Sequence, residues 1–185
     1  DASPERIFPH VLDAIAAERP HAPALIGDGE TLSHSELAAR RNRYARWALA
    51  RGLAKGDTVA LLMRNCPDYL AVWLGLTRVG VCVALLNTNL RGAGLAHCIT
   101  VAAPRLVIAA ADLAEALDGA LPHLSERPHI VWQGPDAQDS LAAASAGFRE
   151  GPLGLGEAPP VTLRDPALLI YTSGTTGLPK PARVR

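Results

Sequence analysis

The sequence lacks the cysteine and histidine patterns that bind zinc or cross-link a small secreted fold. Its three cysteines, Cys66, Cys82 and Cys98, are odd in number, far apart and in no Cys-x-x-Cys pair. No disulfide framework is therefore expected, and buried free thiols in a reducing compartment are the better interpretation. The six histidines show no His-x-x-x-His or mixed Cys/His spacing, so no metal-binding residue is expected in the chain.

An excess of charge of either sign is also missing. Eighteen Lys and Arg residues balance eighteen Asp and Glu residues, so no overall field attracts nucleic acid and no such partner is expected. The apolar run 69–86 contains Arg78 and Gly80. A charge at mid-span is costly, so we expect a helix, a turn and a strand there instead of a membrane span. No basic and then apolar leader follows Asp1, so we expect a cytoplasmic protein, with peripheral membrane association and homo-oligomerisation left open.

Helical and strand-like segments alternate along the chain, which is typical of an α/β fold with a largely parallel sheet flanked by helices. Ser33, with Glu36 three residues later, forms a capping box, and Pro67 suits a first helical residue. Asp112 is expected to cap a helix that ends near Leu121. The expected helices cover residues 7–19, 34–51, 67–78, 93–102 and 112–121, and the expected strands cover 24–26, 31–32, 58–63, 81–86, 105–109, 130–132 and 167–171.

Three segments are expected to follow one another along the chain. Residues 1–133 form the α/β core, 134–160 an Ala-, Gly- and Pro-rich connection with at most a poor helix over 137–146, and 161–185 a strand with a phosphate-binding loop. The last expected strand, Ala167 to Tyr171, ends only fourteen residues before the end of the sequence. We therefore expect this strand to have an uncovered edge that pairs with another chain.

The segment after that strand carries residues that suit a triphosphate. Gly174 and Gly177 permit backbone conformations closed to other residues and a close approach of the main chain to a ligand. Successive backbone N–H groups in such a turn form an anion-binding concavity, and hydroxyl side chains add donors. Lys180, between two prolines that favour extended backbone, supplies positive charge. The predicted ATP phosphate-binding residues are Thr172, Ser173, Gly174, Thr175, Thr176, Gly177 and Lys180.

Two other nucleotide-binding loops do not fit the sequence. A Walker A loop counted from Gly174 needs glycine at 179 and Ser or Thr at 181, and both positions are proline. Gly92-Ala93-Gly94, with Asp112 twenty residues beyond Gly92, imitates a dinucleotide fingerprint. His97 stands where the third glycine belongs, however, and five residues separate the preceding strand from Gly92. A P-loop kinase and a Rossmann dehydrogenase are therefore disfavoured.

The stretch Tyr171-Thr-Ser-Gly-Thr-Thr-Gly-Leu-Pro-Lys180 resembles the phosphate-loop signature of the adenylate-forming superfamily. This superfamily includes acyl-CoA synthetases, peptide-synthetase adenylation domains and luciferases. Residues 31–37, 65–69 and 73–76 resemble the segments that precede this loop in the family, with His34 in place of the usual tyrosine. Residues 87–91 and 95–98, Asn-Thr-Asn-Leu-Arg and Leu-Ala-His-Cys, are similar to the fatty-acid-transport-protein branch, the very-long-chain acyl-CoA synthetases.

The resemblance implies the N-terminal part of the large domain of an acid–thiol ligase. Such an enzyme uses ATP with Mg²⁺ to convert a fatty acid or other carboxylate to an acyl-adenylate, and then forms a thioester with coenzyme A. One departure is Pro181, where the family usually has Gly or Ala, because proline removes an N–H donor and changes how the chain leaves the loop.

The family's remaining functional residues lie in sequence beyond Arg185, so we assign no catalytic residue here. We expect the 185 residues to be inactive alone and to need the remainder of the chain as a partner. A catalytically inert nucleotide-binding or interaction module, and an adenylation domain that passes its acyl group to a carrier-protein thiol, stay open as alternatives. The sequence does not specify the acyl chain length.

Overall fold

The computed structural model of the chain describes residues 7–27, 29–134, 140–172 and 177–185. Its contacts divide the chain into two units that are interleaved along the sequence. The first unit comprises Asp1–Lys55, Asn65–Val81 and Ser145–Asp165, and the second comprises Gly56–Arg64, Cys82–Ala144 and Pro166–Arg185.

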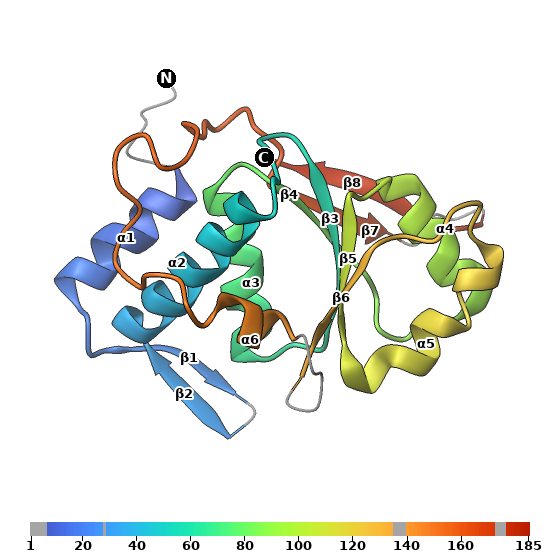
Figure 1. Cartoon of the computed structure of the whole chain (residues 1–185), viewed down its shortest axis with the longest axis horizontal. Coiled ribbons are helices and arrows are strands. Elements are labelled where there is room, and N and C mark those ends of the chain that lie inside the picture. Colours follow the sequence, from blue (N-terminus) through green and yellow to red (C-terminus); the bar gives the residue numbers. More distant parts are fainter. Residues whose placement is uncertain (1–6, 28, 135–139, 173–176) are drawn as a thin grey trace. The chain divides into compact units, whose positions relative to one another are not determined.

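The first unit combines three helices with a two-stranded antiparallel sheet (Figure 1). The helices are α1 (Phe8–Glu18), α2 (His34–Ala50) and α3 (Pro67–Arg78), and the strands are β1 (Pro23–Gly27) and β2 (Glu30–Ser33). The predicted capping box starts α2, because the Ser33 Oγ accepts from the Glu36 N–H at 3.3 Å and the Ser33 N–H donates to the Glu36 carboxylate at 2.8 Å. Pro67 is the first residue of α3, as predicted.

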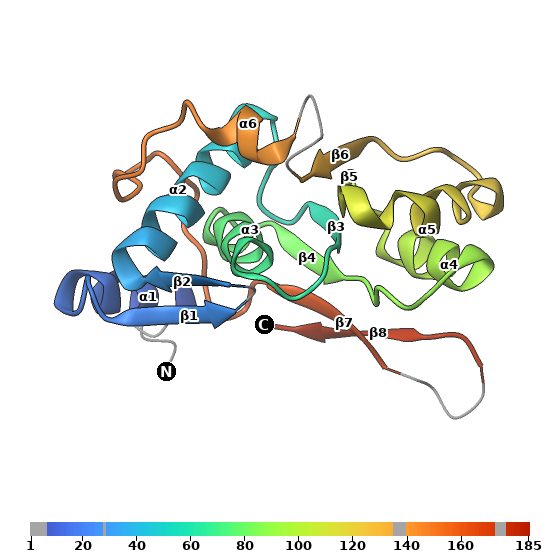
Figure 2. The ribbon, with the colours of Figure 1, turned by 90° about the horizontal axis from the view of Figure 1, so that it is seen from below.

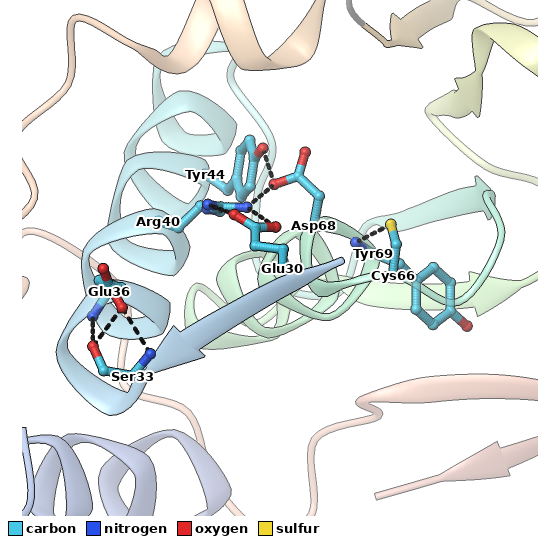
Figure 3. A network of polar contacts seen from close by, with 8 residues as sticks. All are labelled: Glu30, Ser33, Glu36, Arg40, Tyr44, Cys66, Asp68 and Tyr69. Carbon is cyan, nitrogen blue, oxygen red and sulfur yellow. Dashed lines mark hydrogen bonds and ion pairs between the residues drawn. The ribbon is translucent and has the colours of Figure 1, made fainter. Parts of the chain in front are cut away.

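Helices α2 and α3 pack closely because α3 presents a glycine to its neighbour. A Cβ placed on Gly75 would lie 2.7 Å from the Arg41 carbonyl oxygen and 2.8 Å from the Tyr44 Cβ. Polar contacts complete this packing: the Tyr44 hydroxyl donates to the Asp68 carboxylate at 2.7 Å, and Arg40 pairs with Glu30 at 2.6 Å (Figure 3). Strand β2 and the start of α3 are thereby both attached to α2.

Residues 151–160, all of which the structure describes, form neither helix nor strand, as predicted. A buried arginine of α2 nevertheless fixes the segment. Arg46, only 6% exposed, donates to the carbonyls of Arg149, Gly151 and Pro152 at 2.7–2.9 Å and forms two hydrogen bonds with the Glu157 carboxylate at 2.6 and 3.1 Å. The guanidinium thus gives hydrogen-bond partners to backbone carbonyls that have none from a helix or a strand.

The second unit is built on a six-stranded sheet with the order β6-β5-β3-β4-β7-β8 (Figures 1 and 2). Its strands are β3 (Thr58–Leu62), β4 (Cys82–Leu85), β5 (Leu106–Ala110), β6 (Ile130–Gln133), β7 (Leu168–Thr172) and β8 (Lys180–Val184). All neighbours pair in parallel except β7 and β8, which pair antiparallel. The predicted α/β fold with a largely parallel sheet is confirmed. The apolar run 69–86 forms α3, a turn and β4, and no helix in the described ranges is long and apolar enough to cross a membrane.

Helices α4 (Gly92–Ala102) and α5 (Ala114–Asp118) cover one face of this sheet, with the 3₁₀ turns η2 (Ala111–Leu113) and η3 (Leu121–His123) beside α5. Alternate strand residues such as Ala60, Ala84 and Val107 pack there against Leu95 and Ile99 of α4. A further short helix, α6 (Leu141–Ser145), lies within the predicted poor helix 137–146, of which 137–139 fall outside the described residues. As expected, Cys82 and Cys98 are buried free thiols, and burial raises the pKa of each. Cys66 is only half-buried.

Two predictions about this unit are wrong. Asp112 does not cap a helix: its carboxylate accepts from Arg64 Nε at 2.8 Å, α5 begins after a 3₁₀ turn, and α5 ends at Asp118, short of Leu121. The strand after Pro166 also has no uncovered edge, because β8, which the sequence did not predict, pairs along all of β7. Pro181 within β8 obscured that strand in the sequence, although an edge strand tolerates proline.

Candidate phosphate-binding site

The candidate site lies at the carboxyl end of β7, where that strand turns back into β8. Open α/β sheets bind ligands at the carboxyl ends of their parallel strands. Thr172 is the last residue of β7 and Lys180 the first residue of β8, and the two stand opposite each other in the strand register. The Thr172 hydroxyl donates to the Lys180 carbonyl at 3.4 Å. The structure therefore brings together two residues that the sequence analysis placed in the site.

Lys180 is exposed, and no acidic side chain of the described part of the chain forms an ion pair with it. Its ammonium group is thus available to an anion. Gly177 has a φ of 148°, as its predicted conformational freedom requires, and a Cβ added there would meet no atom within 4 Å. Both features are compatible with a loop that approaches a ligand through its backbone. Ser173, Gly174, Thr175 and Thr176 lie outside the described residues, and their role stays a prediction.

Two residues of α4 contact the hairpin, and the sequence analysis missed both contacts. The Tyr171 hydroxyl donates to the Cys98 carbonyl at 2.7 Å, and His97 Nε2 lies 3.1 Å from the Pro179 carbonyl oxygen. The only sequence signal was the similarity of residues 95–98 to the fatty-acid-transport-protein branch, which does not say what His97 contacts.

A metal-binding cluster is not evident beside this hairpin. Across the described ranges, no group of three or more His, Cys, Asp or Glu side chains could hold a metal ion. Because Mg²⁺ is commonly held by one or two carboxylates together with the phosphates of its nucleotide, this finding concerns only a site made wholly of protein side chains.

The first unit contains a cavity of about 440 Å³ between β1 and the start of α3. Its described lining residues, among them Ile26, Cys66, Tyr69 and Trp73, carry no charge. Cys66 accepts from the Tyr69 N–H at 3.4 Å at the start of α3 (Figure 3). Since a triphosphate needs cations or aligned N–H donors, this apolar cavity is not a phosphate site.

Comparison with known proteins places the chain in one enzyme family. The family described as AMP-binding enzyme matches residues 12–184. Long-chain fatty acid transport protein 2 of Rattus norvegicus is 36% identical over 187 residues, which cover 98% of this chain and 30% of that protein. Long-chain fatty acid transport protein 6 of Homo sapiens is 38% identical over 172 residues, covering 90% of this chain and 28% of that protein. The chain thus spans about three tenths of the length of these curated relatives.

Solved structures have the same fold. The inhibitor-bound N-terminal domain of FACL13 from Mycobacterium tuberculosis superimposes with a TM-score of 0.81 at 25% identity, covering 95% of this chain and 43% of that one. VinN in complex with 3-methylaspartate superimposes with a TM-score of 0.77 at 29% identity, covering 95% of this chain and 46% of VinN. The anthranilate CoA ligase AuaEII with anthranoyl-AMP superimposes with a TM-score of 0.79 at 22% identity, covering 95% of this chain and 34% of AuaEII. At this identity the match is evidence for the shared fold only. The chain therefore belongs to the AMP-binding enzymes, the adenylate-forming superfamily predicted from its phosphate loop, with relatives in the fatty acid transport protein branch.

Proposed function

We propose that the chain is the N-terminal part of an ATP-dependent acid–thiol ligase and that its β7–β8 hairpin holds the β- and γ-phosphates of ATP. The observation that carries this proposal is the pairing of Thr172 with Lys180 at the carboxyl end of a parallel-sheet strand, in a chain of the AMP-binding family. These two residues flank the glycines and hydroxyls of the predicted phosphate loop. Lys180 carries a charge that no described carboxylate neutralises.

The proposed reaction has two steps. A carboxylate oxygen attacks the α-phosphorus of ATP, the bond to the β-phosphate oxygen breaks, and acyl-adenylate and pyrophosphate form. The thiolate of coenzyme A then attacks the acyl carbon and releases AMP. Such chemistry depends chiefly on positioning and on stabilising phosphate charge. Backbone N–H groups and hydroxyls of residues 172–177 would orient the phosphates, and Lys180 would offset their charge.

Magnesium bound with ATP would neutralise part of the phosphate charge. Because the described residues offer no ligand cluster for it, we assign no step to a metal held by this segment. Coenzyme A and the carboxylate would be held by the rest of the protein that carries this segment, and we propose that these residues have no ligase activity alone.

The proposed substrate is a fatty acid, because the relatives that are 36% and 38% identical are named long-chain fatty acid transport proteins. We place the reaction in the cytoplasm or at a membrane surface, where such an amphipathic substrate is available. A second candidate is adenylation of an amino acid with transfer to a carrier-protein thiol, since VinN, 29% identical, binds 3-methylaspartate. Identity to the fatty acid transport proteins is higher, and we favour the first.

ATP–pyrophosphate exchange by the full-length protein that carries this segment tests the proposal. The panel should contain long-chain fatty acids, aryl acids and amino acids, followed by coenzyme A with mass detection of the thioester. We expect exchange with fatty acids and a CoA thioester product. Exchange with amino acids alone would support the second candidate, and ATP binding without exchange for any acid would support an inert nucleotide-binding module.

A further inference from the structure

Helix α4 contacts the hairpin on both sides of the Thr172–Lys180 pair. Tyr171, which donates to the Cys98 carbonyl at 2.7 Å, immediately precedes Thr172. Pro179, whose carbonyl lies 3.1 Å from His97 Nε2, immediately precedes Lys180. Two consecutive α4 residues therefore contact the hairpin on either side of this pair: Tyr171 lies on its strand side and Pro179 on its loop side.

In both hydrogen bonds the chemistry of the partners decides which group donates and which accepts. A proline carbonyl can only accept, so His97 donates through Nε2–H, which both the imidazolium and one neutral tautomer provide. The Tyr171 hydroxyl donates to a carbonyl within the helix. Burial raises the pKa of Tyr171, so its phenol stays protonated near neutral pH.

Helix α4 is anchored in the core, whereas β8 is an edge strand of the sheet that the described residues form. Leu95, Cys98 and Ile99 anchor α4 in the core of the second unit and are at most 3% exposed. Strand β8 is the last strand of its sheet, and four of its five residues are exposed. Figure 2 shows α4 alongside the hairpin, and the helix packs against β8. The position of Lys180 therefore depends on β7 and on α4.

We propose that His97 and Tyr171 are positioning residues that hold the two flanks of the phosphate loop, Lys180 and Thr172, at the separation a triphosphate requires. This inference rests on the proposed function. Neither side chain contacts the phosphates in this account; each acts through the backbone of the neighbouring residue. Loss of one such neutral hydrogen bond should weaken ATP binding about 3- to 10-fold.

The test compares four variants of the full-length protein. His97→Ala and Tyr171→Phe each remove one donor, and His97→Gln keeps an N–H donor at a similar reach. Thr100→Ala, an exposed residue on the same helix, is the matched control. The first readout, without nucleotide, is the amide hydrogen exchange of residues 178–184 by mass spectrometry. The second is the KM for ATP and for the carboxylate in pyrophosphate exchange.

We expect faster exchange over residues 178–184 and a roughly 3- to 10-fold higher KM for ATP in His97→Ala and Tyr171→Phe, with the KM for the carboxylate unchanged. His97→Gln should restore much of both losses, and Thr100→Ala should match the wild type. If His97→Ala and Tyr171→Phe both show the same hydrogen exchange and the same KM values as the wild type, the inference is overturned. Equal rises in both KM values, with a lowered melting temperature, would overturn it in favour of a general structural role. If the wild type itself does not bind ATP, the proposed function fails, and the hydrogen-exchange data still decide whether α4 supports the hairpin.

Discussion

Replacement of Arg46 by methionine should destabilise the first unit strongly. Methionine keeps an unbranched apolar side chain and removes every donor, so the Glu157 carboxylate and three backbone carbonyls lose their partner. Breaking a buried ion pair costs about 3–5 kcal/mol. Glu157 retains 24% of its side-chain exposure, so water can replace part of the loss, and we expect about 2–4 kcal/mol. At about 2–4 °C per kcal/mol, the melting temperature should fall by roughly 4–16 °C.

Arg149→Met provides the control for this prediction. Arg149 pairs with the same Glu157 carboxylate at 3.3 Å, but its side chain is 79% exposed. An exposed ion pair contributes about 0–1 kcal/mol, so this variant should melt within a few degrees of the wild type. Thermal unfolding followed by circular dichroism measures both variants, and limited proteolysis reports whether residues 149–157 detach. Equal melting temperatures for the two variants would refute the idea that burial of Arg46 fixes this segment.

Three further perturbations follow from particular contacts. Hydrogen bonds from Arg46 and then from the Gly154 N–H, with the nearby arginine charges, lower the pKa of Glu157 from 4.5 to about 2. The stabilising contribution of the Glu157 carboxylate is therefore present above pH 4.5 and lost as the pH falls toward 2, so the free energy of unfolding of Glu157→Gln, measured by denaturant titration, should fall less steeply over this pH range. Gly75→Ala places a Cβ 2.7 Å from the Arg41 carbonyl oxygen, which should cost about 1–3 kcal/mol in urea unfolding, and an unchanged midpoint would contradict the close helix packing. Gly177→Val introduces strain at a φ of 148° in an exposed loop, so ATP titration should show weaker binding at a nearly unchanged melting temperature; preserved ATP affinity with lost stability would indicate a purely structural glycine.

The elements that the sequence predicted well are those with local signals. Helix α3 runs over Pro67–Arg78 as predicted because a proline at its first position and a glycine after its last turn delimit it. The Ser33–Glu36 capping box forms as expected, since both partners lie within one helical turn. Short apolar runs between turn residues became the parallel strands β3, β4 and β5.

Contacts between distant residues were not predictable in this way. Asp112 is a residue type that often caps helices, yet its carboxylate pairs with Arg64, 48 residues away in sequence. Strand β8 forms because β7 offers it a partner, although the sequence around Pro181 predicts no strand. A loop-like composition likewise described residues 151–160 correctly without indicating that Arg46 of α2 binds them.

The candidate site shows the same division. Thr172, Gly177 and Lys180 could be predicted as phosphate-site residues because all three lie within one short sequence motif. His97 and Tyr171 contact their partners across 82 and 73 residues of sequence, so only the folded chain brings them together. The short motif thus indicates the proposed phosphate-binding residues, and the folded chain adds the contacts of His97 and Tyr171 with the hairpin.

The most direct test of the account separates the two half-reactions in Lys180→Ala, made in the full-length protein. Lys180 is proposed to act on ATP, so the variant should slow acyl-adenylate formation while thioester formation from supplied acyl-adenylate and coenzyme A is largely preserved. Loss of a charge-assisted contact of about 1.5–3 kcal/mol predicts a roughly 10- to 150-fold slower first step. The measurement is pyrophosphate release with a long-chain fatty acid, alongside acyl-CoA formation from the synthetic adenylate. A selective loss in the first step supports the phosphate-binding role, and equal losses in both steps would contradict it.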